Sequence, residues 1–225
     1  MGLDMYLNKV KKVGNMSLKE IITTADYVSY LDRPEKYIDS TFEDWCGGNE
    51  TFVVKSKVKQ IRENMEPDTC PAWADGIPNY EPYGESIHKN IAYWRKANHI
   101  HNWFVENVQD GNDDCKDYEV SKNVLLQLLN VVNTVLANSK LVDGKVSAGQ
   151  RFTENGLEEI LEDGQVIEDT SVAEELLPTC SGFFFGGTDY DVWYYRDLEN
   201  TKERIEKILK ETDFDNEIVY YSSSW

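Results

Sequence analysis

Residues 93–104, which read YWRKANHIHNWF, place the tightest constraint on the fold because they combine a helical repeat with an unusual charge pattern. At about 100° per residue, apolar side chains recur on one face across residues 93–108, which predicts an amphipathic helix. No acidic residue occurs within residues 86–105, although the chain contains 41 of them. A core-facing helix normally keeps polar groups away from its apolar face. We therefore expect a ligand at this helix.

The polar and aromatic side chains of this helix are suited to a phosphate-bearing molecule. A tryptophan or tyrosine ring can stack on a base, and an arginine or lysine can pair with a phosphate. An asparagine and a histidine on the shoulder of the apolar face can supply directional hydrogen bonds. The alternative is that the rings are packing residues and that the histidine is a core-edge residue with a backbone partner. The candidate ligand-binding residues of this helix are Tyr93, Trp94, Arg95, Lys96, Asn98 and His101.

A second informative stretch, residues 176–198, reads LLPTCSGFFFGGTDYDVWYYRDL. Its phenylalanines predict a buried strand, and its glycine pair predicts a tight turn. Thr188 and Asp191 fit a capping box at the start of a long helix. Free backbone N–H groups at such a helix start can hold an anion, which makes Gly187 and Thr188 candidates. The lysine of a Walker loop is absent, and Asp189 would repel phosphate. Asp189 can instead accept from a ribose hydroxyl or hold a cation, and capping alone is the simpler alternative.

Strand patterns begin and end the chain. Residues 2–12 alternate, with Leu3 and Met5 on one face and Asp4 and Tyr6 on the other. We count Asp4 and Tyr6 as candidate ligand contacts, although a solvated strand face explains them as well. Residues 217–221 predict a terminal strand, and the first strand is its natural neighbour.

Between these strands the sequence predicts mainly helices. Ser17 and Glu20 form a capping box, and Ser121 precedes a strongly apolar helix. Two Asp-Gly pairs, at residues 143–144 and 163–164, have the pattern of hairpin turns. Residues 66–88 form a proline- and glycine-rich loop that we interpret as a cover over the central helix. We therefore expect a single α+β domain over residues 1–225, with four or five helices packed on a small, mainly antiparallel sheet.

Composition limits the classes of function. With 40% hydrophobic and 12% aromatic residues, the chain has enough apolar material for one sizeable core. A formal net charge of −18 argues against direct binding to nucleic-acid backbone or to an anionic membrane surface. No secretion signal or membrane-spanning run is recognisable, and the four cysteines form no Cys-x-x-Cys pair, so we expect a cytoplasmic protein with free thiols. We assign no metal and no cofactor.

Four blocks of the sequence resemble a family of small proteins encoded by tailed phages and prophages. These blocks are MGLDMYL, YWRKANHIHNWFVENVQDG, LLPTCSGFFFGGTDYD and YYSSSW, and the resemblance spans the whole chain. It carries over no catalytic role. It implies an accessory protein that acts in the cytoplasm of the bacterial host, where countering host defence is a common task.

Three functions follow from the sequence. The leading hypothesis is binding of a nucleotide-like small molecule, including sequestration of a host immune signal. The second is a nucleotide or phosphodiester hydrolase in which His101 is a base or metal ligand, completed by Asp4 or Asp189. Against the hydrolase, His99 and His101 point about 200° apart on a helix. The third is an acidic protein that mimics DNA or inhibits a host protein. The sequence leaves enzyme activity open, leaning against it, and is compatible with a homo-oligomer.

Overall fold

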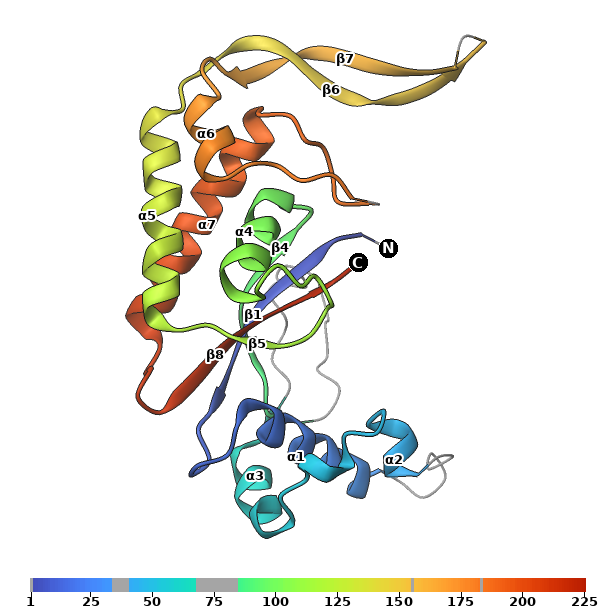
Figure 1. The fold of residues 1–225 in the computed structure, drawn as a ribbon, viewed down its shortest axis with the longest axis vertical. Helices are drawn as coiled ribbons and strands as arrows, with labels where there is room; N and C mark the ends of the chain where they lie inside the picture. Colours follow the sequence, from blue (N-terminus) through green and yellow to red (C-terminus); the bar gives the residue numbers. More distant parts are fainter. Residues whose placement is uncertain (1, 34–40, 68–84, 155, 183) are drawn as a thin grey trace. The chain divides into compact units, whose positions relative to one another are not determined.

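A computed structural model describes the 225-residue chain except for residues 1, 34–40, 68–84, 155 and 183. The described residues form an α+β protein, as expected, whose sheets are mostly antiparallel. The helices within them number seven, more than the four or five we expected. The helices are α1 (Leu18–Leu31), α2 (Phe42–Trp45), α3 (Val58–Asn64), α4 (Asn98–Val108), α5 (Lys122–Asn138), α6 (Ser171–Leu176) and α7 (Val192–Glu211) (Figure 1).

The strands form one four-stranded sheet and two two-stranded sheets. The larger sheet has the order β4-β1-β8-β5, so the first and last strands of the chain are neighbours, as predicted. The smaller sheets pair β2 with β3 and β6 with β7. The strands are β1 (Asp4–Lys11), β2 (Glu66–Pro67), β3 (Glu85–Ser86), β4 (Lys89–Arg95), β5 (Tyr118–Glu119), β6 (Leu141–Thr153), β7 (Gly156–Ile167) and β8 (Glu217–Ser224).

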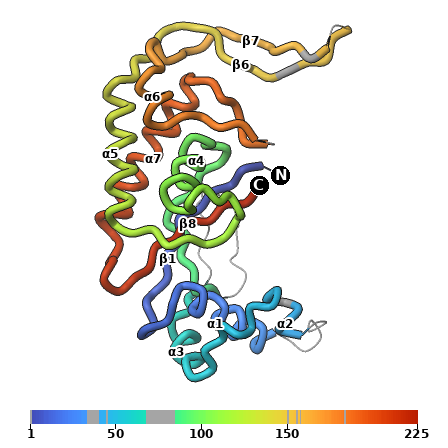
Figure 2. The backbone as a smooth tube through the Cα atoms, viewed as in Figure 1, coloured from blue at the N-terminus to red at the C-terminus, as the bar shows by residue number. Residues whose placement is uncertain are grey.

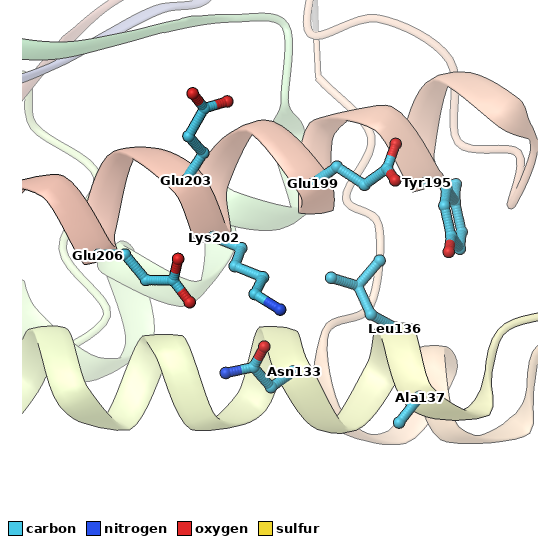
Figure 3. A pocket seen from close by; sticks show the side chains of 8 residues that line it. All are labelled: Asn133, Leu136, Ala137, Tyr195, Glu199, Lys202, Glu203 and Glu206. Carbon is cyan, nitrogen blue, oxygen red and sulfur yellow. The ribbon is translucent and has the colours of Figure 1, made fainter.

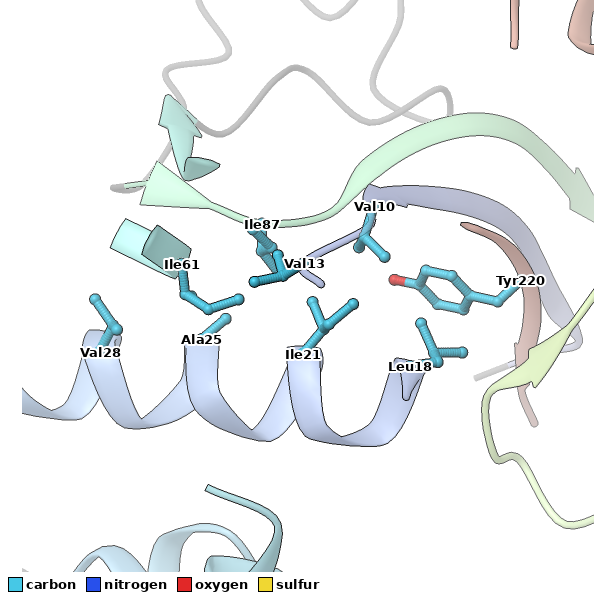
Figure 4. Close-up of a cluster of buried hydrophobic side chains, with 9 residues drawn as sticks. All are labelled: Val10, Val13, Leu18, Ile21, Ala25, Val28, Ile61, Ile87 and Tyr220. Carbon is cyan, nitrogen blue, oxygen red and sulfur yellow. The ribbon is translucent and has the colours of Figure 1, made fainter. Parts of the chain in front are cut away.

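The chain divides into two compact units. The first comprises residues 1–6, 94–212 and 221–225, and the second comprises residues 7–93 and 213–220. In the second unit, apolar side chains of α1 pack with residues from β1, α3 and β8 to form a core (Figure 4). The members of this core are Val10, Val13, Leu18, Ile21, Ala25, Val28, Ile61, Ile87 and Tyr220.

Local signals place several elements where the sequence predicted them. Ser17 and Glu20 form the expected capping box at the start of α1. The Ser121 hydroxyl accepts from the Val124 N–H at the start of α5. Along Leu3 and the start of β1, the alternate residues Leu3, Met5 and Leu7 are fully buried, whereas Asp4 and Tyr6 are only partly buried. This alternation confirms the predicted strand and its apolar face.

The Asp-Gly pairs are not turns, which corrects the sequence interpretation. Gly144 lies directly opposite Gly164 within the paired strands of the β6–β7 hairpin, near its open end, and the last pair before the loop is Thr153 with Gly156. A Cβ atom at Gly144 would come within 2.6 Å of Val166, so a valine of the opposite strand fills the space beside each glycine. Figure 2 shows this long ribbon extending past the ends of α5 and α7. The proposed cover at residues 66–88 lies largely outside the described residues.

Within the described part of the chain, no helix is long and apolar enough to cross a bilayer.

Candidate functional site

The central stretch is a strand followed by a helix, not one helix as predicted. β4 ends at Arg95, and α4 begins at Asn98. In β4, Ala92 and Trp94 are buried, while Tyr93 between them is partly exposed, so the residues alternate as strand residues do. Lys96 then adopts a left-handed backbone with φ of 60°, which ends the strand. The predicted helical face therefore exists only from residue 97 onward.

The backbone turn at Lys96 brings two cationic side chains to the same place. Successive residues of an extended strand point to opposite faces. Here, however, a Cβ atom at Gly2 would lie 3.4 Å from Nη2 of Arg95 and 3.6 Å from Cε of Lys96. The guanidinium group of Arg95 also pairs with Asp4 at 3.0 Å. Burial and the nearby Asp4 carboxylate raise the pKa of the Tyr6 hydroxyl, which hydrogen-bonds Ser224.

Residues 180–187 are attached to this junction through the side chain of Asn98. The Nδ2 group of Asn98 donates to the carbonyl oxygens of Gly187 at 2.7 Å and Phe185 at 3.3 Å. The Oδ1 atom of Asn98 accepts from the backbone N–H of Cys180 at 3.0 Å. Asn98 is buried. It thus acts as an internal support that fixes the loop and is not placed to contact a ligand.

The same loop contains a strained backbone position that contacts the start of β1. Phe184 has φ of 68°, in the left-handed region that non-glycine residues seldom adopt, and its side chain is exposed. Its carbonyl oxygen accepts from the N–H of Leu3 at 3.4 Å, and the Leu3 carbonyl accepts from the N–H of Lys96 at 2.8 Å. Gly186, with φ of 99°, packs so closely that a Cβ atom there would lie 3.0 Å from the Lys96 carbonyl oxygen. Phe184 and Phe185 lie in no strand, so the prediction of a buried strand was wrong for these two residues, and Phe183 lies outside the described residues.

The structure places Trp94 and His101 in the interior. The Trp94 ring is buried and its Nε1–H donates to Thr201 Oγ1 at 2.9 Å, so the predicted stacking role is not available to it. His101 is also buried, with Nδ1 2.7 Å from the Tyr221 hydroxyl and Nε2 3.0 Å from Asp113. Both ring nitrogens are thus occupied by protein groups. This arrangement does not favour the base or metal-ligand role of the hydrolase hypothesis.

The remaining predicted residues divide between surface and structural positions. α7 begins at Val192, and the carboxylate of Asp191 caps it by accepting from the N–H groups of Trp193 and Tyr194. Gly187, Thr188 and Asp189 are exposed but precede the helix, so the predicted capping box of Thr188 with Asp191 is wrong and these three residues do not form its first turn. Burial, with the nearby Glu159 and Asp191, raises the pKa of Asp189.

The structure brings most of the predicted site residues into one unit. Most of them, together with Gly2, lie around the β4–α4 junction of the first unit, whereas Tyr93 belongs to the second unit. Sequence reasoning missed Gly2, Phe184, Asp113 and Trp225. The only sequence signal for Trp225 was its aromatic side chain beside a strand pattern, which does not distinguish a packed ring from an exposed one.

A surface hollow of this unit lies between α5 and α7 (Figure 3). Glu199, Glu203 and Glu206 line it together with Lys202, and Figure 3 shows Glu203 turned away from it. Among the described residues, no group of three or more histidine, cysteine, aspartate or glutamate side chains is arranged to hold a metal ion.

Comparison with protein-family models gave no match, and neither curated protein sequences nor solved structures gave one.

Proposed function

We propose that the chain binds a small phosphate-bearing, nucleotide-like molecule on the surface around Gly2, Arg95 and Lys96. The observation that supports this is the convergence of the Arg95 and Lys96 side chains beside Gly2. Asp4 offsets part of the Arg95 charge, and the adjacent Lys96 charge keeps this surface net positive, which attracts an anion. Arginine and lysine are the side chains that most often hold phosphate groups.

The strained backbone of the same surface supports the proposal. Left-handed non-glycine residues cost about 1–3 kcal/mol each and persist where the surrounding structure enforces them. Lys96 and Phe184 are two such residues, and the backbone of Leu3 hydrogen-bonds to both. Such positions concentrate at ligand clamps. Within the described residues, the Lys96 ammonium group has no ion-pair partner, so its charge is available to an incoming anion.

The biological role that we propose follows from the phage resemblance. A protein that holds a nucleotide without cleaving it can lower the free concentration of a host signal. We therefore propose that the bound molecule is a nucleotide signal made by the host and that the protein acts in counter-defence in the host cytoplasm.

Calorimetric titration with nucleotides, including cyclic and ADP-ribose-type compounds, tests the binding. The decisive variant is Lys96→Gly, because glycine keeps the left-handed backbone while removing the charge. We expect Lys96→Gly to bind the nucleotide about tenfold more weakly, because one phosphate contact worth about 1.4 kcal/mol is lost. The folding stability of this variant should be unchanged or slightly raised. Lys207→Ala, on the exposed face of α7 in the same unit, is the matched control. If no phosphate compound binds the wild-type protein, the proposal fails.

A second candidate function rests on the β6–β7 ribbon. The Phe152 side chain is 89% exposed and Leu161 is 54% exposed, among the acidic side chains of β7. Two-stranded ribbons are marginally stable alone, and their unpaired edges readily accept a partner. These features favour a protein partner with a basic surface and an apolar recess, as expected of an acidic inhibitor.

Co-purification from host cells distinguishes the two functions. A partner that is lost with Phe152→Asp but retained with Lys96→Gly would support the ribbon as the binding surface. Retention of every partner by Phe152→Asp would reject it.

A further inference from the structure

Trp225 presents an indole ring whose N–H group is bound by protein while about half of the side chain is exposed. Its Nε1–H donates to Asp113 Oδ1 at 3.0 Å, and its ring meets Phe185 edge-on, with centroids 5.9 Å apart and an interplanar angle of 66°. The side chain is nevertheless 53% exposed. Because the polar edge is already hydrogen-bonded, the aromatic face is the part that remains for a ligand.

The ring is held in position by a buried network. The second oxygen of Asp113 lies 3.0 Å from Nε2 of His101, and the Nδ1 atom of His101 lies 2.7 Å from the Tyr221 hydroxyl. His101 and Tyr221 are both buried. This network fixes the carboxylate that holds the indole, so binding to the ring face costs little additional ordering.

Two chains of contacts connect this ring with the cationic pair. The Trp225 ring packs against Phe185, and the next residue is Gly186. A Cβ atom placed at Gly186 would lie 3.1 Å from Cβ of Lys96, so the two backbones are in close contact. Ser224, which precedes Trp225, hydrogen-bonds Tyr6, and Tyr6 lies within the electrostatic influence of Asp4 and Arg95. All of these residues belong to the first unit. The exposed ring and the two cations therefore belong to one continuous region.

We propose that Trp225 is the stacking surface for the base of a nucleotide whose phosphate lies at Arg95 and Lys96. This inference rests on the proposed phosphate binding and narrows the ligand class to nucleoside phosphates, as opposed to sugar phosphates or inorganic polyphosphates. Every base has a π-face, and stacking is tolerant of base identity. The site is therefore expected to accept both purine and pyrimidine nucleotides, with tighter binding of the larger purine rings.

The test compares ligands with and without a base. Adenosine 5′-monophosphate, cytidine 5′-monophosphate, ribose 5-phosphate and pyrophosphate are titrated calorimetrically into the wild-type protein, Trp225→Ala and Trp193→Ala. Trp193 is the matched control because it is 60% exposed in the same unit, with its ring facing the Arg196 guanidinium at 5.0 Å. We expect the wild type to bind adenosine 5′-monophosphate about tenfold more tightly than ribose 5-phosphate.

Trp225→Ala is expected to remove this preference while binding ribose 5-phosphate as the wild type does, and Trp193→Ala is expected to behave as the wild type. If Trp225→Ala keeps the preference for the nucleotide, or if the wild type has none, the stacking role is refuted and phosphate binding stands. If neither ribose 5-phosphate nor pyrophosphate nor either nucleotide binds, both proposals fail.

Discussion

Replacing Asn98 by aspartate probes the support beneath the proposed site with almost no change in side-chain shape. The substitution puts an oxygen where Nδ2 donates to the carbonyls of Gly187 and Phe185, and leaves the acceptor for Cys180 in place. Two hydrogen bonds, each worth about 1 kcal/mol net, are lost, and the Phe185 carbonyl, whose hydrogen bond is buried, costs about 1–3 kcal/mol more when it is left without a donor. We therefore expect Asn98→Asp to destabilise the first unit by about 3–5 kcal/mol at pH 8.

The pH dependence gives this prediction a signature that a simple packing defect lacks. Burial raises the pKa of the introduced carboxyl group above its unfolded value. The folded state then binds more protons than the unfolded state, so stability falls as pH rises from about 4 through the raised pKa. At pH 5 the protonated group can donate one of the two hydrogen bonds, and the destabilisation should be smaller than at pH 8. Asn98→Ala should lack this dependence.

Urea denaturation at pH 5 and pH 8 measures both effects, and amide hydrogen exchange of residues 180–187 locates them. Asn107→Asp is the matched control on the same helix, because its single hydrogen bond goes to the Trp103 carbonyl at an exposed position. We expect the control to change stability by about 1 kcal/mol or less. A loss below about 1 kcal/mol for Asn98→Asp at pH 8 would show that Asn98 does not hold the loop.

Three further predictions concern buried groups and the close contact at the site. Burial lowers the pKa of His88 to about 4, so folding stability should be full above pH 6.5 and fall by about 3 kcal/mol toward pH 4, and a urea series on His88→Gln should be flatter. Burial raises the pKa of Asp197 to about 7, so stability falls as pH rises from 4 to 7, and Asp197→Asn should raise the melting temperature at pH 8 but not at pH 4. Gly186→Ala should cost about 1–3 kcal/mol by denaturation and weaken phosphate binding in calorimetry, because its Cβ would press on the Lys96 carbonyl.

Local signals in the sequence predicted elements well, because a cap or an alternation depends only on residues a few positions apart. Ser17 with Glu20, and Ser121, place the starts of α1 and α5 correctly. The β6–β7 hairpin shows the limit of such signals. Gly144 faces Gly164 because of a pairing twenty residues apart in sequence, and an Asp-Gly pair reads as a turn unless the partner strand is known.

The wrong helix prediction at residues 93–97 and the cationic pair of the proposed site have the same physical origin. Tyr93, Ala97 and Ile100 fit a helical repeat, yet the alternation of Ala92 and Trp94 fits a strand equally well, and periodicity does not decide between the two. The left-handed turn at Lys96 decides it, and a lysine gives no sequence signal for a conformation that usually belongs to glycine. On an ideal helix, Arg95 and Lys96 would be about 100° apart around the axis. The irregular backbone instead brings both side chains beside Gly2. The left-handed conformation of Lys96 therefore explains both the wrong helix prediction and the proximity of the two cations.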